Sequence, residues 1–279
     1  MKLSPDFHFN QGNLQDFVDC RRRFWLRHVR QLAWPAVQSE PVLENELHIQ
    51  RGALFHRLVQ QHLLGLPEAR LRAMIADEQV AQWWDNYIKD VNLKSLNSLS
   101  VLYPEVTLTS RLAGYRLVAK YDLIAVTSES QTFIYDWKTS RQRPKSEWLE
   151  KRLQTRLYPY LLARAGAHLN LGKNFEPEQV VMLYWFAGFP EQPQRIAYHT
   201  AQYQADERYL TATIDTILSL DIDGFFQTDD HRRCRFCIYR SLCERGEKAG
   251  SLDEMEGMSE PQADFDFDLD FEQIGEIEF

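Results

Sequence analysis

The sequence predicts an α/β fold in which a central sheet is flanked by helices. Three observations carry this prediction: apolar residues alternate with period two between residues 101 and 137, helical periodicity lies on both sides of that stretch, and strand-like sequence returns near residue 180. Strands bracketed by helices are typical of a sheet covered by helical layers. With 279 residues, of which 44% are hydrophobic, the chain can bury a sizeable core.

The first 90 residues favour helices. Apolar residues with helical spacing predict three of them, over residues 13–29, 44–64 and 68–89. The first carries Cys20 followed by several arginines, and Pro35 and Pro41 mark the linker after it. Residues 92–100 are polar and resemble a loop.

The middle of the chain predicts three strands, the last two of which form an antiparallel hairpin. Strands are expected over residues 101–109, 114–126 and 132–137, with a hairpin turn of Ser, Thr, Gln and Glu between the last two. Beyond these strands we expect a helix over 147–165, strands over 179–186 and 195–199, and a helix over 205–220. Residues 1–250 would form one domain.

The hairpin carries candidate catalytic residues. Asp136 and Lys138 lie two apart on one strand and share a face, whereas Trp137 points the other way. Asp122, at the end of the preceding strand, would place a second carboxylate on that face. Carboxylates suit a Mg²⁺ ion, which keeps positions for water and phosphate. The alternative is a surface hairpin with one ion pair of little energetic value.

The helix after the hairpin offers two further candidates. Gln154 and Tyr158 are four residues apart and therefore lie on one helix face, where they could hold water or phosphate. The alternative is an exposed Gln and a core Tyr. Basic residues around them suit a phosphate backbone, although such runs are often solvated helix faces: Arg141, Arg143, Lys145, Lys151, Arg152 and Arg156.

The four cysteines form a candidate metal site. Cys234, Cys237 and Cys243 have the spacing C-x₂-C-x₅-C, and the remaining cysteine is Cys20. Structural zinc usually takes two close pairs of ligands, whereas a triplet with one remote partner suits a [4Fe–4S] cluster at least as well. Such a site would join the first helix to the C-terminal segment. Four unligated thiols remain the alternative.

Charge is divided unevenly between the body and the C-terminal segment. Residues 251–279 contain eleven of the 40 acidic residues and no Lys or Arg, so the net charge of −8 conceals a body of about +3. A slightly basic body is compatible with a nucleic acid partner. We expect the acidic segment to be disordered. It could dock a protein partner, cover the basic cleft, or only increase solubility.

The sequence gives no sign of a membrane protein. No apolar run reaches the roughly 18 residues that a membrane span needs, and the first residues lack the apolar core of a signal peptide. A cytoplasmic location is therefore expected, and cysteines in that compartment favour metal ligation over disulfides.

Together these residues resemble the PD-(D/E)XK nuclease superfamily, in particular its RecB-like branch with an iron–sulfur staple. That branch includes the nuclease domain of AddB-type helicase–nucleases and the CRISPR-associated iron–sulfur exonucleases. The similarity runs from Leu14 to Cys243 in the family's order: helix with one cysteine, helical His56, Asp122, the Asp136-x-Lys138 strand, Gln154-x-x-x-Tyr158, and the cysteine triplet. It implies a restriction-endonuclease-like mixed central sheet flanked by helices, with helical N-terminal additions and a cysteine-ligated C-terminal staple.

The resemblance also implies a role for each matched residue. Asp122 and Asp136 would bind Mg²⁺ or Mn²⁺ with the Trp137 carbonyl and His56, and Lys138 would position the attacking water. Gln154 and Tyr158 would line the active site and contact DNA, and the four cysteines would hold a [4Fe–4S] cluster, with zinc as the alternative. Two positions depart from the family pattern, namely Tyr121 in place of Pro and Ala119 in place of Gly.

The resulting hypothesis is a metal-dependent DNA nuclease, in particular an exonuclease on single-stranded or end-containing DNA, acting in repair, recombination or defence. The acidic segment would dock a repair or helicase protein. Two alternatives belong to other classes: a catalytically silent DNA-binding or scaffold module, and an iron–sulfur redox protein. The intact Asp122, Asp136 and Lys138 argue against the scaffold, and nothing beyond the cysteines supports the redox protein.

Overall fold

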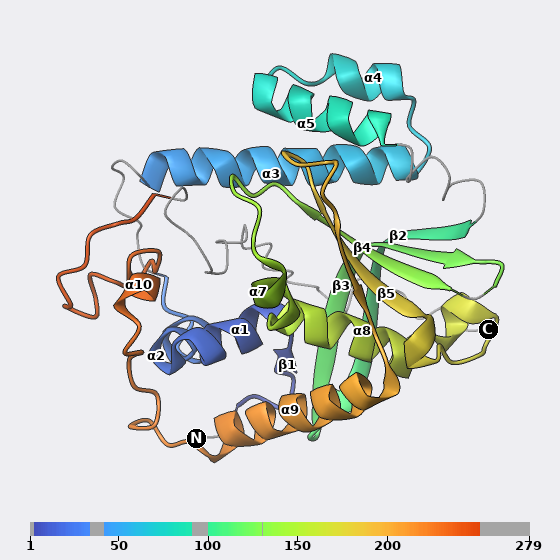
Figure 1. The fold of residues 1–279 in the computed structure, drawn as a ribbon. Helices are drawn as coiled ribbons and strands as arrows, with labels where there is room; N and C mark the ends of the chain where they lie inside the picture. Colours follow the sequence, from blue (N-terminus) through green and yellow to red (C-terminus); the bar gives the residue numbers. More distant parts are fainter. Residues whose placement is uncertain (1–2, 34–41, 91–99, 130, 252–279) are drawn as a thin grey trace.

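The computed structural model describes residues 3–33, 42–90, 100–129 and 131–251, and it confirms the α/β fold. A mixed sheet runs through the middle of the molecule, and helices pack on both of its faces (Figure 1). Pro35, Pro41, most of the predicted loop over 92–100 and the acidic segment beyond residue 251 lie outside the described residues. In the described part, every helix is too short or too polar to cross a membrane.

Strand β3 organises the sheet. The strand order is β1-β3-β4-β5-β6, and β2 pairs with the other edge of β3. The pairs β2–β3, β3–β4 and β5–β6 are antiparallel, whereas β1–β3 and β4–β5 are parallel. The strands span β1 (His8–Phe9), β2 (Ser100–Leu112), β3 (Tyr115–Thr127), β4 (Thr132–Lys138), β5 (Val180–Phe186) and β6 (Gln194–Ala197). The predicted hairpin is confirmed.

Two helical layers enclose the sheet. One layer contains α1 (Gln11–Asp19), α8 (Leu153–Ala165) and α9 (Thr200–Ser219), whose apolar residues pack with Ile134, Met182 and Tyr184 from the strands. The other contains α3 (Val42–Leu63), α4 (Glu68–Ala73) and α5 (Glu78–Lys89), which pack on Tyr135 and Trp137. Because neighbouring residues of β4 face different layers, Asp136 and Lys138 face the layer that contains α8.

Along the long strand β3, the side chains stop alternating regularly between the two helical layers at Asp122. Before that point, Ala119 and Tyr121 face the α8 layer; after it, Leu123 faces the α3 layer and Ile124 faces the α8 layer. The pairing partners change at the same place, because β3 pairs with β1 through Leu117 and with β4 only from Leu123 onward. Asp122 therefore lies at a break in the regular alternation, between the two pairings.

Three predicted helices are interrupted. The helix predicted over 13–29 stops at α1, because Cys20 has an extended backbone, and it resumes as α2 (Arg21–Phe24) followed by a π-helical turn at Trp25–Val29. The helix over 68–89 divides into α4 and α5, where the Asp77 side chain caps α5 by accepting from Gln79 N and Val80 N. The helix over 147–165 divides into α7 (Ser146–Glu150) and α8. A short α10 (His231–Cys234) precedes the cysteine triplet.

Candidate nuclease site

The end of β4 brings together the acid and the amine that the sequence predicts. Lys138 Nζ lies 2.7 Å from Asp136 Oδ2, and only 4% of the Asp136 surface is exposed. Lys138 Nζ also lies 5.6 Å from the centre of the Tyr184 ring on the neighbouring strand. The shared face therefore holds a nearly buried ion pair, which costs desolvation energy unless both groups are well satisfied.

Asp122 reaches this ion pair from the neighbouring strand. Its Oδ2 accepts a hydrogen bond of 2.9 Å from the backbone N–H of Trp137, the residue between Asp136 and Lys138. Asp122, which lies inside β3, thus fastens this strand to the end of β4. The structure brings Asp122 beside Asp136 and Lys138, as the sequence predicts, although the break in alternation at Asp122 was not foreseen.

His56 enters from the opposite layer. Its Nδ1 lies 3.5 Å from Asp122 Oδ2, next to the end of β4. Gly52, one turn earlier on α3, permits this approach: a Cβ at residue 52 would lie 2.8 Å from Thr139 Oγ1, just beyond β4. Gly52 was not selected from the sequence, although a glycine inside a helix is disfavoured and therefore informative.

Gln154 joins the acid to the amine. Its Nε2 donates to Asp136 Oδ1, and its Oε1 accepts a hydrogen bond of 3.0 Å from Lys138 Nζ. The side chain is buried, so the alternative of an exposed Gln154 is wrong. Tyr158 lies one turn further along α8, with its ring centre 4.8 Å from that of Tyr121. Tyr121 OH donates to the Tyr158 carbonyl at 2.8 Å, so this departure from the family pattern fastens β3 to α8.

The two carboxyl groups differ in their electrostatic environment. Burial raises the pKa of Asp136, with Lys138 opposing this shift and the charge of Asp122 adding to it. Burial acts on Asp122 in the same direction, but His56, the Trp137 N–H and Lys138 outweigh it and hold the Asp122 pKa below its usual value. Burial also raises the pKa of the Tyr158 phenol, with the charges of Asp136 and Asp122 adding to the effect. Two acids with opposite pKa shifts in one site are typical of a catalytic centre.

The donor atoms suit a hard divalent cation in kind. Two carboxylates and an imidazole can bind Mg²⁺ or Mn²⁺, and the charge of Asp122 helps to raise the pKa of Asp136, as expected for two acidic groups near each other. Across the described residues, no three His, Cys, Asp or Glu side chains are already gathered to hold one metal ion. The ligand set of Asp122, Asp136, His56 and the Trp137 carbonyl therefore stays a prediction.

The predicted basic stretch has mixed surroundings. The Arg156 guanidinium pairs with Asp206 at 2.8 Å, the Arg152 guanidinium lies over the Trp148 ring, and Arg152 is buried. Arg143 donates to Gln192 O and Gln194 Oε1. The first two side chains thus have structural partners within the protein, and the prediction that this stretch binds DNA remains untested.

The four cysteines line one cavity. Cys20, Cys234, Cys237 and Cys243 surround it, and four arginines share its wall: Arg23, Arg233, Arg240 and Arg245. Burial raises the pKa of Cys237 to about 11, with Arg23 opposing this shift and the neighbouring Cys20 and Cys243 adding to it. None of the four forms a disulfide. Residues that are 214 positions apart in the sequence therefore meet at one place.

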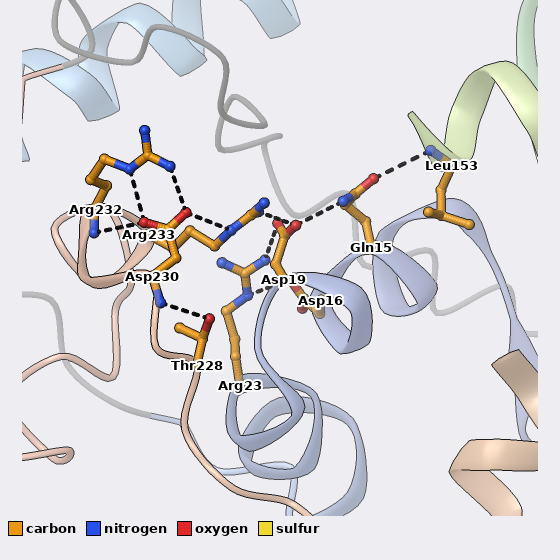
Figure 2. Close-up of polar contacts among 9 residues, drawn as sticks. All are labelled: Gln15, Asp16, Asp19, Arg23, Leu153, Thr228, Asp230, Arg232 and Arg233. Carbon is orange, nitrogen blue, oxygen red and sulfur yellow. Dashed lines mark hydrogen bonds and ion pairs between the residues drawn. The ribbon is translucent and has the colours of Figure 1, made fainter. Parts of the chain in front are cut away.

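A network of charges, which was not predicted from the sequence, encloses this cavity. Arg23 pairs with Asp16 at 2.7 Å and with Asp19 at 2.8 Å, and Arg233 donates to Asp19 from the C-terminal segment (Figure 2). Asp19 precedes Cys20, and Arg233 precedes Cys234. The spacing of Asp16, Asp19 and Arg23 by three and four residues was the available signal.

This network predicts a specific loss of stability in acid. Burial tends to raise the pKa of Asp16, but Arg23, His28 and Arg27 outweigh it and hold the Asp16 pKa well below its usual value. Because the unfolded pKa is about 3.9, the stabilisation is present above that value and is lost as the pH falls below it. Below about pH 4, the free energy of unfolding should fall more steeply in the native protein than in Asp16→Asn, by up to about 1.4 kcal/mol per pH unit.

Urea unfolding at pH steps from 6 to 3 measures this difference. Asp215→Asn is the matched control, since Asp215 is exposed on α9. Parallel curves for the native protein and Asp16→Asn would show that the charges around Asp16 do not couple to folding.

The fold and the site together define an α/β protein with a carboxylate–lysine centre at the end of its central strands. The family model of the PD-(D/E)XK nuclease superfamily matches residues 8–244. The chain therefore belongs to that superfamily. This membership supports a nuclease activity, that is, the hydrolysis of nucleic acid. Members of the superfamily generally use divalent metals such as Mg²⁺.

The fold is shared with a solved structure. A candidate exonuclease from Eubacterium rectale aligns with 83% of this chain and 91% of its own, with 10% identity and a TM-score of 0.50. The crystal structure of SSO0001 aligns with 88% of each chain, with 15% identity and a TM-score of 0.38. No curated protein matches the sequence.

Proposed function

We propose that the chain is a divalent-metal-dependent deoxyribonuclease that acts as an exonuclease on single-stranded DNA or on DNA ends, in repair, recombination or defence. The observation that carries this proposal is the convergence of Asp122, inside β3, with Asp136 and Lys138 at the end of β4, with Gln154 holding the last two. The exonuclease name of one structural neighbour agrees with the mode of action.

The metal would be held by Asp122 and Asp136, together with the Trp137 carbonyl and His56. Bound there, Mg²⁺ or Mn²⁺ would supply Lewis acidity and lower the pKa of water from about 15.7 toward 7. The hydrogen bond from Trp137 N–H fixes one oxygen of Asp122, which limits rotation of that carboxylate beside the end of β4. The raised pKa of Asp136 predicts that a cation is needed to keep both acids ionised together.

The residues of the chain would bind and orient the phosphodiester. The Lys138 ammonium would hold the attacking water and stabilise negative charge that develops on the phosphate. Gln154 limits the movement of the Lys138 ammonium, because its amide oxygen accepts from Nζ. Tyr158 would line the site as a neutral phenol. Arg141, Arg143, Lys145 and Lys151 would contact the DNA backbone beside α7.

The cysteines would hold a [4Fe–4S] cluster that acts as a structural staple, with zinc as the alternative metal. Support comes from the common cavity and from the four arginines in its wall, whose charges suit a ligand set of four thiolates. Metal binding there would contribute directly to the folding free energy, because it joins α1 to the segment after α9. The acidic segment would dock a repair or helicase protein.

Anaerobic purification followed by cleavage assays tests the proposal. If the cluster is bound, the purified protein should show a visible absorption band that is lost on oxidation. A colourless protein that contains stoichiometric zinc would support the alternative metal. Substrates labelled at the 5′ or 3′ end, single- or double-stranded, should be degraded with Mg²⁺ or Mn²⁺ and remain intact with EDTA. Absence of cleavage of every DNA and RNA substrate by metal-loaded protein would overturn the nuclease proposal.

A further inference from the structure

A chain of polar contacts connects the cysteine segment to the helix that carries Gln154. Arg233 donates to Asp19, Asp19 accepts from Gln15 Nε2 at 2.8 Å, and Gln15 Oε1 accepts from the backbone N–H of Leu153 at 3.4 Å. Figure 2 shows these residues in one continuous row, from the segment before Cys234 across α1 to the start of α8. The row joins parts of the sequence that are more than a hundred residues apart.

Gln15 supplies an acceptor that α8 does not provide for itself. The first N–H groups of a helix have no partner within the helix. The residue before α8, Arg152, makes no capping hydrogen bond with its side chain within the described structure. The amide oxygen of Gln15, which lies on a different helix, accepts the hydrogen bond from the first N–H group of α8 instead. Its orientation is fixed because the nitrogen of the same amide donates to Asp19.

The position of the α8 start matters for the site. Leu153 is buried in the core, and Gln154, the next residue, contacts both Asp136 and Lys138. A rotation or shift of the first turn of α8 would therefore move the Gln154 amide relative to both partners. The side chain of Gln15 limits that movement from outside the sheet.

We infer that Gln15 is a positioning residue: it holds the start of α8 against the Asp19–Arg233 ion pair and thereby sets the placement of Gln154 between Asp136 and Lys138. The inference rests on the proposed nuclease function for its effect on catalysis. Its structural part, the coupling of the cysteine segment to α8, does not depend on that function.

Two substitutions separate the contacts of Gln15. Gln15→Met keeps the length of the side chain and removes both hydrogen bonds, whereas Gln15→Glu keeps the acceptor for Leu153 N–H. In Gln15→Met, hydrogen exchange at the first amides of α8 should become roughly ten-fold faster. Cleavage by the full chain should show a kcat lower by roughly ten-fold or more, with KM changed by less than about two-fold. Gln15→Glu should recover part of both losses.

Gln204→Met is the matched control, because Gln204 is exposed on α9. It should leave exchange in α8 and kcat unchanged. If Gln15→Met behaves like this control, the capping role of Gln15 is wrong. Should Gln15→Met fail to fold, Arg233→Gln against the native protein still tests the row of contacts, since it removes the ion pair with Asp19 and leaves Gln15 unchanged.

A double-mutant cycle tests the connection to the cysteine segment. Arg233→Gln removes the ion pair with Asp19, and it should also speed exchange at the start of α8. Combined with Gln15→Met, it should add little further acceleration, because both changes interrupt the same row of contacts. Fully additive effects would overturn the coupling.

Hydrogen exchange and cleavage together distinguish a failure of the inference about Gln15 from a failure of the nuclease proposal. If the native protein cleaves no nucleic acid but exchange in α8 follows the expected pattern, the nuclease proposal fails and the coupling stands. If the native protein cleaves DNA but neither exchange nor kcat responds to Gln15→Met, the inference about Gln15 fails and the nuclease proposal stands.

Discussion

Asp136→Ala should abolish metal-dependent cleavage, with kcat lower by roughly 10³-fold or more. The change removes one of the two carboxylates proposed to hold the cation and leaves Lys138 without its ion-pair partner at 2.7 Å. Lys138→Met should have a similar effect, because it keeps the length of the side chain and removes its charge. Cleavage of end-labelled DNA under single-turnover conditions measures both losses without interference from product release.

The matched variants distinguish a catalytic loss from a folding defect. Asp136→Asn keeps the shape of the side chain and removes its charge, so it should be as inactive as Asp136→Ala while its thermal midpoint stays closer to that of the native protein. Asp215→Asn removes an exposed carboxylate on α9 and should retain full activity. Purified Asp136→Ala that still cleaves DNA at the native rate would refute the assignment of the site.

Cys237→Ser should remove the metal that we propose the four cysteines bind, and it should destabilise the region that joins α1 to the C-terminal segment. Structural metal sites contribute on the order of 10 kcal/mol to folding, so a loss of at least ~3 kcal/mol and a decrease of about 10 °C in the thermal midpoint are expected. Limited proteolysis should cleave first beyond α9. Iron and zinc analysis of the purified variant should show metal loss together with destabilisation.

Ile222→Ser introduces the same residue at an exposed position in the same segment, and it should preserve the metal content and the thermal midpoint. A Cys237→Ser protein with unchanged metal content would eliminate Cys237 as a ligand. A protein that loses its metal but keeps its thermal midpoint would eliminate the structural role of the site.

Local pattern predicted the parts of the fold and site that depend on neighbouring residues. Asp136 and Lys138 share a face because alternation along a short strand is regular, and Gln154 and Tyr158 share a helix face for the same kind of reason. The existence of strands β2 to β6 and of the long helix α3 followed from periodicity alone, whereas the two-residue strand β1 was not predicted.

Features that depend on distant residues could not be predicted. The break in alternation at Asp122 coincides with a change of pairing partner from β1 to β4, and nothing in the strand's own sequence indicates it. Helical periodicity continues through Cys20, yet its extended backbone ends α1 there. The contact of Gln15 with Leu153 joins positions 138 residues apart, so no local rule could reveal it.

The order in which the ribosome makes these parts has a consequence for the nascent chain. Asp19 is synthesised 214 residues before its partner Arg233, which corresponds to roughly 10 to 40 s of translation. During that interval α1 lacks the segment that completes its charge network. A growing polypeptide would therefore complete this charge network only after Arg233 has left the exit tunnel.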